Sequence, residues 1–274
     1  MLHVQTKLIM PLAAFALIAA AVSACGDKEK RQAEALYVEA ETAAQNGDYR
    51  QSVALLNSID SLYPKQVAIR RKAMHLRAKS GEHITLDEIA ANEAERARLT
   101  LEGDSLQQLL SKVDHPLEPY YVAKGAKSVV GDNGIEARMA PDGMFYMISS
   151  LRSPKVNHTS VTVSDGGASA RTAEIAHDGE RNDRSMGYEV IHYMMPECDS
   201  VGRFIAQHPG ALTVTFNGSK SHTMPLKAEQ ADGIATVWRA AVNVRDRRHN
   251  ALEHQRLERQ LELNRSQAAR TYEE

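Results

Sequence analysis

The eleven histidines are the first side chains to consider for chemistry beyond packing. Among them, His158, His177, His192 and His222 lie in the middle of the chain. None of the four is two or four residues from another histidine or a suitable cysteine, so the sequence has no local zinc motif. His249 and His254 are five residues apart on a predicted helix and point to different faces. A metal site assembled from distant strands stays open as an alternative.

Other catalytic patterns are missing from the sequence. It has no Gly-x-Ser-x-Gly elbow, no phosphate loop and no His-Glu-x-x-His helix. Asp178 and Glu180 could pair, but they lie in a loop of alternating charges, which is typical of a solvated surface. We therefore predict that the protein is not an enzyme and binds no cofactor or metal.

The two cysteines have different surroundings. Cys25 follows an apolar run and the small residues Val22-Ser23-Ala24, and a polar segment comes after it. This arrangement resembles the lipobox of bacterial lipoproteins, with Val22 where that family more often has Leu. The resemblance implies a signal peptide over residues 1–24, acylation of Cys25, and a short linker over residues 25–31. Cys198 is then unable to pair within the chain, and we predict a buried, inert thiol.

The lipobox resemblance also implies a location and a first partner. Acyl chains on Cys25 would hold the protein on a lipid bilayer, because each buried methylene contributes about 0.8 kcal/mol. The location is the cell membrane or the outer membrane, on a periplasmic or surface face, and the sequence leaves these alternatives open. The 33 basic residues against 35 acidic residues argue against nucleic acid as a partner.

The segment after the linker, residues 32–82, has helical periodicity. Two apolar runs are separated by Asn46-Gly47-Asp48-Tyr49, where Gly47 can adopt the left-handed conformation that ends a helix. Pro64 should stop the second helix, and a third is expected from Val67 to Lys79. Positions 33–66 resemble one tetratricopeptide (TPR) repeat, although the first helix lacks the large aromatic residue. A single repeat cannot bury its own apolar face, so this TPR-like hairpin must pack on another element.

Two long helices are predicted around the middle of the chain. Residues 83–116 should form one of them, opened by a capping box from Thr85 to Glu88 and bent or broken near Gly103. Its expected apolar stripe is Leu86, Ile89, Ala90, Ala94, Ala97, Leu101, Leu106, Leu109, Leu110 and Val113. Residues 231–274 should form the other helix, and antiparallel pairing of the two as coiled-coil arms would bury both stripes.

Residues 117–230 alternate apolar and polar residues, which predicts strands. The clearest strands are residues 143–148, 160–163, 188–194 and 211–216. Asn217-Gly218 is a hairpin signal that favours a type I′ turn, with positive φ at both residues. A short helix is expected from Ser200 to Gln207. The predicted fold class is therefore α+β, with a TPR-like hairpin and coiled-coil arms flanking a small antiparallel β-sandwich-like module.

Three Asp-Ser-aliphatic triplets resemble the O-glycosylation signal of secreted Bacteroidota proteins. They make Ser61, Ser105 and Ser200 candidate glycosylation sites, although Asp and Ser are also common at helix starts and turns.

The layout as a whole resembles Bacteroidota envelope lipoproteins that join TPR-like helices to a β module. We predict a membrane-anchored, non-catalytic scaffold or protein-binding module, whose partner is an envelope protein. The alternatives are a glycan-binding surface lipoprotein or an enzyme with an unrecognised site. The glycan alternative requires exposed aromatic residues in the β module, and its candidates are Tyr120, Tyr121, Phe145, Tyr146, Tyr188 and Tyr193.

Overall fold

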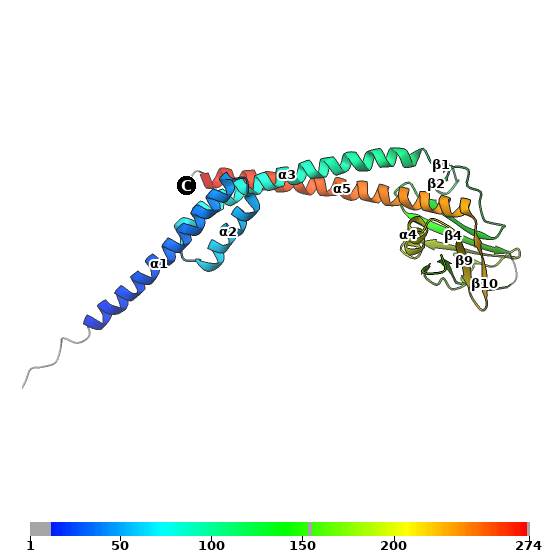
Figure 1. Cartoon of the computed structure of the whole chain (residues 1–274), viewed down its shortest axis with the longest axis horizontal. Coiled ribbons are helices and arrows are strands. Elements are labelled where there is room, and N and C mark those ends of the chain that lie inside the picture. The colour runs from blue at the N-terminus through cyan, green and yellow to red at the C-terminus, as the bar shows by residue number, and fades with distance from the viewer. Residues whose placement is uncertain (1–11, 153–154, 273–274) are drawn as a thin grey trace, which may run out of the picture. The chain divides into compact units, whose positions relative to one another are not determined.

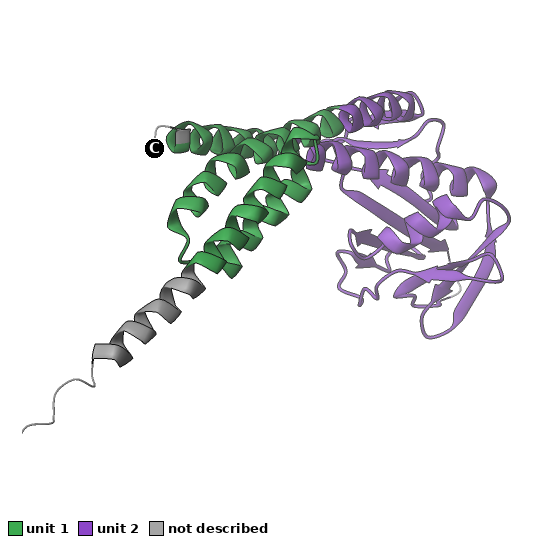
Figure 2. Ribbon diagram, turned by 60° about the vertical axis from the view of Figure 1, so that its left-hand side comes forward, with its two compact units in different colours: residues 1–93, 252–274 green, residues 94–251 purple. Residues whose placement is uncertain are grey.

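The computed structural model describes residues 12–152 and 155–272, and the side chains of residues 27–152 and 155–271. These residues divide into two compact units (Figure 2). Unit 1 comprises residues 1–93 and 252–274, and unit 2 comprises residues 94–251. The fold class is α+β, as the sequence predicted, with a helical N-terminal region and two antiparallel sheets.

The helices labelled in Figure 1 are α1 (Leu12–Gln45), α2 (Tyr49–Leu62), α3 (Val67–Gln107), α4 (Asp199–Gln207) and α5 (Ala228–Tyr272). Helix α4 agrees closely with the predicted short helix, and its expected inner residues Val201, Phe204 and Ile205 are buried. Helices α3 and α5 contribute residues to both units.

A hairpin of α1 and α2 forms the first part of unit 1. Gly47 has a φ of 83° and lies between α1 and α2, as predicted. The Asp48 carboxylate accepts a hydrogen bond from the Gln51 backbone amide at 3.3 Å, which caps α2. The buried residues Leu56 and Ile59 of α2 share a small core with Ile69 of α3 and with alanines of α1. The hairpin therefore packs on the start of α3.

Helices α3 and α5 also pair within unit 1. The Asn264 side-chain amide donates to Thr85 Oγ1 at 3.1 Å, and Arg265 forms an ion pair with Glu82 at 2.9 Å. Nearer the start of α3, His75 Nδ1 lies 3.1 Å from the backbone oxygen of Ala268. Residue numbers on α5 rise as those on α3 fall, so the two helices are antiparallel here, as the sequence predicted.

The predicted capping box is wrong. Thr85 lies inside α3, and its hydroxyl donates to the Gly81 backbone oxygen at 2.8 Å instead of capping a new helix. Gly81 does not break the helix. A Cβ at this position would lie 3.1 Å from the Asn264 side chain, so the missing side chain of Gly81 makes room for Asn264 of α5.

The predicted apolar stripe on this helix is also wrong. Leu86 and Leu101 are 40% and 70% exposed, whereas Leu99 is 3% exposed. In unit 2, the Asn243 side-chain amide of α5 donates to the Leu99 backbone oxygen at 2.9 Å. A Cβ on Gly103 would lie 2.6 Å from Asn243 Oδ1. Helix α3 continues through Gly103, and the glycine makes room for the close approach of Asn243.

Helix α3 ends at Gln107, earlier than the predicted boundary at residue 116. Leu110 and Val113, which were assigned to the helical stripe, lie in strand β1, and Leu109 is 52% exposed. Strand β1 pairs with the neighbouring strand β2, so the backbone of this segment forms hydrogen bonds within a sheet and not within a helix. The module thus begins before residue 117.

Unit 2 contains ten strands among the described residues. They are β1 (Leu110–Val113), β2 (Tyr120–Ala123), β3 (Gly134–Met139), β4 (Phe145–Arg152), β5 (Ser160–Ser164), β6 (Ser169–Arg171), β7 (Asn182–Asp183), β8 (Tyr188–Met194), β9 (Leu212–Asn217) and β10 (Ser221–Leu226). One sheet has the order β1-β2-β3-β4-β8-β7, and the other has the order β10-β9-β5-β6. The predicted strands correspond to β4, β5, β8 and β9.

Both sheets share one core with α4 and the first half of α5. Phe145 of β4, Val214 of β9 and Ile234 of α5 are all almost completely buried in it. The predicted module boundary at residue 230 therefore divides this core, because buried residues of α5 from Ala231 to Ala241 belong to it.

The β9–β10 hairpin is confirmed, but its turn is not type I′. Asn217 pairs with Ser221, so three residues connect the strands. Neither Asn217 nor Gly218 is among the described residues with positive φ. A Cβ on Gly218 would lie 2.4 Å from the Val156 backbone oxygen. The glycine is needed because another backbone segment approaches it closely.

Candidate functional site

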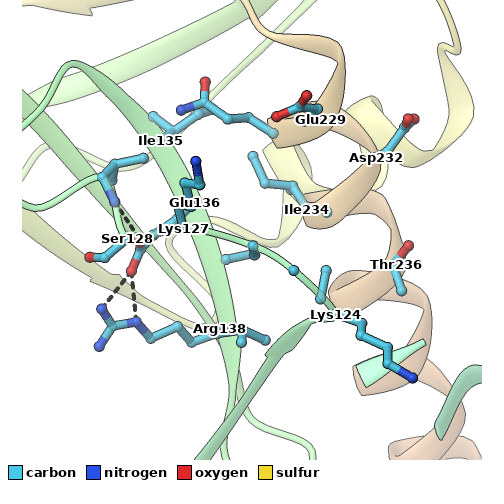
Figure 3. A pocket seen from close by; sticks show the side chains of 18 of the residues that line it. Lys124, Lys127, Ser128, Ile135, Glu136, Arg138, Glu229, Asp232, Ile234 and Thr236 are labelled. Carbon is cyan, nitrogen blue, oxygen red and sulfur yellow. Dashed lines mark hydrogen bonds and ion pairs between the residues drawn. The ribbon is translucent and has the colours of Figure 1, made fainter. Parts of the chain in front are cut away.

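A cleft of about 920 Å³ opens in unit 2 between β2, β3 and the start of α5. Figure 3 shows Ile135, Glu136 and Arg138 along β3 on one side, and Ile234 and Thr236 along α5 on the other. The segment that connects β2 to β3 completes the lining. The volume is near the upper end of the range for pockets that hold small molecules. Sequence patterns did not predict this cleft.

A largely buried ion pair fixes the connecting segment. Arg138 Nε donates to Glu136 Oε1 at 2.7 Å, and the two side chains are only 16% and 12% exposed. The other carboxylate oxygen, Glu136 Oε2, accepts the Val129 backbone amide at 2.6 Å. Val129 is 3% exposed, so its buried side chain and its amide anchor the otherwise exposed β2–β3 connection at this residue. The side of the cleft that contains β3 and Val129 is therefore held in place by hydrogen bonds, as expected for a preformed binding site.

Aromatic rings surround the guanidinium of Arg138. Its Cζ lies 4.4 Å from the centroid of the Tyr120 ring, a cation–π contact. Burial raises the pKa of the Tyr146 hydroxyl, and Arg138 opposes this shift. Burial lowers the pKa of His192, and Arg138 lowers it further. The imidazole is thus biased towards its neutral form.

Exposed charges line the cleft on both sides. Lys124 and Lys127 follow β2, and Glu229 and Asp232 are in the first two turns of α5. Lys227 lies 3.9 Å from Asp132 in a loose ion pair. The cleft therefore offers positive and negative groups beside apolar side chains that are at least partly exposed, such as Leu109 and Val122.

Ser149, His158 and Glu189 form a second polar cluster, and none of the three lines the cleft. His158 Nε2 lies 2.8 Å from Ser149 Oγ, and His158 Nδ1 lies 2.9 Å from Glu189 Oε2. A nucleophile, a base and an acid are arranged in this order in serine hydrolases. However, Ser149 and His158 are 0% exposed and Glu189 is 6% exposed, so a substrate has no access to the hydroxyl.

Burial and hydrogen bonds shift the pKa values of His158 and Glu189 in this cluster. Burial lowers the pKa of His158, although Glu189 opposes the shift. Burial by itself would raise the pKa of Glu189, but hydrogen bonds from the His158 and Asn157 amides and from the His158 ring lower it overall. A neutral His158 that donates from Nδ1 and accepts from Ser149 satisfies every group. We interpret the cluster as a structural support.

Histidine spacing could not reveal this cluster, because its members come from separate segments. A weaker signal was present in the strand alternation. Glu189 has the same inward phase on β8 as Ile191 and Tyr193, and Ser149 has the same inward phase on β4 as Met147. A carboxylate at an inward position requires buried partners, and that requirement could have identified Glu189.

Two of the sequence interpretations for unit 2 are confirmed. Cys198 is 0% exposed, burial raises the pKa of its thiol to about 12, and the thiol donates to the Tyr193 backbone oxygen at 3.2 Å. The Asp178 carboxylate accepts backbone amides of the loop that follows it, at 2.9 Å from both Glu180 and Arg181. Asp178 therefore shapes an exposed loop and does not pair with Glu180.

The three candidate glycosylation serines are all exposed, and they lie on different helices. Each hydroxyl donates to a backbone oxygen: Ser61 to Asn57, Ser105 to Leu101 and Ser200 to Arg171. Glycosylation of these residues remains a prediction. Cys25, the predicted lipidation site, falls within the backbone of α1, but its side chain lies outside the described residues, as do residues 1–11 of the expected signal peptide.

The aromatic candidates for glycan binding differ in exposure. Phe145 and Tyr193 are completely buried in the core. The four other tyrosines are partly exposed, and the Tyr120 ring is already in contact with Arg138.

Protein-family models, curated proteins and solved structures were all compared with the chain, and none of them matches it. Within residues 12–152 and 155–272, no helix is both long and apolar enough to cross a membrane.

Proposed function

We propose that the chain is a membrane-anchored envelope lipoprotein that acts as a non-catalytic scaffold, and that unit 2 is its protein-binding module. The observation that carries this proposal is the cleft beside β2, β3 and α5, which combines a fixed wall, apolar residues and exposed charges of both signs. These are the features of a recognition surface. The buried position of Ser149 and His158 favours binding over hydrolysis.

The anchor follows from the lipobox pattern that ends at Cys25. Cys25→Ala should move the protein from the membrane fraction to the soluble fraction or leave an unprocessed precursor, because no thiol remains to be acylated. Fractionation with detergent partitioning and intact mass would measure this. Ser23→Ala is the matched control and should stay on the membrane, since another small residue replaces Ser23. A Cys25→Ala protein of mature length that stays on membranes would contradict the anchor.

Binding through the cleft is tested by filling it with a bulky side chain. Ala126 is exposed and lines the cleft, so Ala126→Trp should reduce the recovery of at least one envelope partner by about tenfold or more. Ala168→Trp is the matched control, because Ala168 is exposed in the β5–β6 turn and is not part of the cleft lining. Quantitative mass spectrometry after purification from solubilised membranes is the measurement. Equal partner lists for the two variants would contradict the proposal.

A further inference from the structure

Four exposed charges of the cleft have no partner among the described residues. Lys124 and Lys127 on the β2–β3 connection and Glu229 and Asp232 on α5 take part in none of the ion pairs of this part of the chain. The positive pair and the negative pair stand on different walls. A ligand that carries only one sign of charge would be attracted to one wall and repelled by the other.

A buried acceptor on the same lining also lacks a partner. The side-chain oxygen of Gln230 is shielded from solvent and accepts no hydrogen bond from any residue that the structure describes. The Gln230 amide lies against Gly134, where a Cβ would come within 2.5 Å of it. A buried acceptor without a donor destabilises the folded chain, because it has lost its hydrogen bonds to water. Gln230 as a whole is partly exposed and lines the cleft, so a rotation of its side chain would bring this oxygen to an N–H group of a ligand and remove the cost.

We infer that the cleft takes an extended peptide segment of mixed charge, with an acidic side chain towards Lys124 and Lys127 and a basic side chain towards Glu229 and Asp232. An apolar side chain between them meets the accessible apolar lining, which includes Leu109 and Val122. A backbone amide of the segment donates to Gln230. This inference rests on the proposed protein-binding function and specifies the chemistry of the segment that is bound.

Three labelled synthetic peptides of about eight residues would test the inference by fluorescence anisotropy on the solubilised full-length chain. One alternates Glu, Val and Arg, and the others replace all charged positions with Glu or with Arg. The mixed peptide should bind most tightly. Lys124→Glu with Lys127→Glu should weaken its binding by about tenfold, since attraction becomes repulsion. Adding Glu229→Lys and Asp232→Lys should restore it to within about threefold of the parent, because the segment can bind in the opposite direction.

Gln230→Met separates peptide recognition from charge alone. This unbranched substitution removes the acceptor without adding a charge, and it should weaken binding of the mixed peptide by about fivefold, the equivalent of one hydrogen bond. Unchanged thermal unfolding of each variant would show that the fold is intact.

Several results would overturn the inference. They are tighter binding of the all-Glu or all-Arg peptide, equal affinity of the parent and the Lys124→Glu/Lys127→Glu variant, failure of the fourfold exchange to restore binding, and no effect of Gln230→Met. If any of them occurred while Ala126→Trp still reduced partner recovery, the peptide inference would fail and the proposed function would stand.

Discussion

Glu189→Ala should destabilise unit 2 by about 3–5 kcal/mol, because it removes a buried charge with three donors. The carboxylate accepts the backbone amides of Asn157 and His158 and the Nδ1–H of the His158 ring, at 2.7–2.9 Å. Alanine would leave the two His158 donors buried without an acceptor, and the Asn157 amide would lose its acceptor as well. Urea unfolding followed through the fluorescence of Trp238, the single tryptophan, would measure the loss.

Two further variants serve as comparisons for Glu189→Ala. Glu174→Ala removes an exposed carboxylate that pairs with Arg171, so it should change the unfolding free energy by about 0.5 kcal/mol or less. Glu189→Gln keeps one acceptor oxygen and should fall between Glu189→Ala and the parent. Equal stability of Glu189→Ala and Glu174→Ala would show that the Glu189 interactions do not hold unit 2 together.

The same cluster predicts how stability depends on pH. The pKa of His158 is lower in the folded protein than its unfolded value of about 6.5, so the unfolded chain binds more protons as the pH falls below that value. Stability should therefore be fully present above about pH 6.5 and should decrease below it. Glu189, whose pKa is also lowered, adds a further loss below about pH 4.3. His158→Asn should flatten the decrease between about pH 6.5 and pH 5.

Gly218→Ala should destabilise unit 2 by about 2–3 kcal/mol, although the residue is exposed. The new Cβ would lie 2.4 Å from the Val156 oxygen and 2.5 Å from the Asn157 oxygen, and both of these are backbone atoms. The Val156 oxygen is also held by the amide and the hydroxyl of Ser219, each at 2.9 Å. Relief of the clash would therefore break hydrogen bonds beside His158.

Gly167→Ala is the control for Gly218→Ala, because Gly167 also lies in a turn between two strands of the same sheet. Its φ is not positive and its nearest neighbour would be the Asp165 carboxylate at 3.6 Å, an ordinary contact. It should change stability by no more than about 0.5 kcal/mol. If both variants unfolded at the same urea concentration, the approach of residues 156–157 to Gly218 would be energetically irrelevant.

The sequence by itself determined features that depend on neighbouring residues. Gly47 ends α1, Pro64 follows the end of α2, and the alternation from Tyr188 to Met194 matches β8. Each of these depends on backbone conformations that a few adjacent side chains allow or forbid.

Tertiary structure decided which faces and partners these elements use. Leu86 and Leu101 are apolar but exposed, because α3 turns Thr85 and Leu99 towards α5. Asn264 and Asn243 fit against glycines of α3. Steric fit at these glycines, and not an apolar stripe, therefore determines which face of α3 packs on α5. Such fits join residues more than a hundred positions apart, and hydrophobic periodicity carries no information about them.

The cleft and the Ser149–His158–Glu189 cluster were also decided by the tertiary structure. Glu136, Gln230 and Lys127 meet around one space only because the β2–β3 connection folds beside α5, and Ser149, His158 and Glu189 meet only inside the core. Their chemistry comes from desolvation and from distances between separate segments, which are properties of the folded chain. The sequence could indicate that Glu189 needs a buried partner, but only the tertiary structure supplied His158.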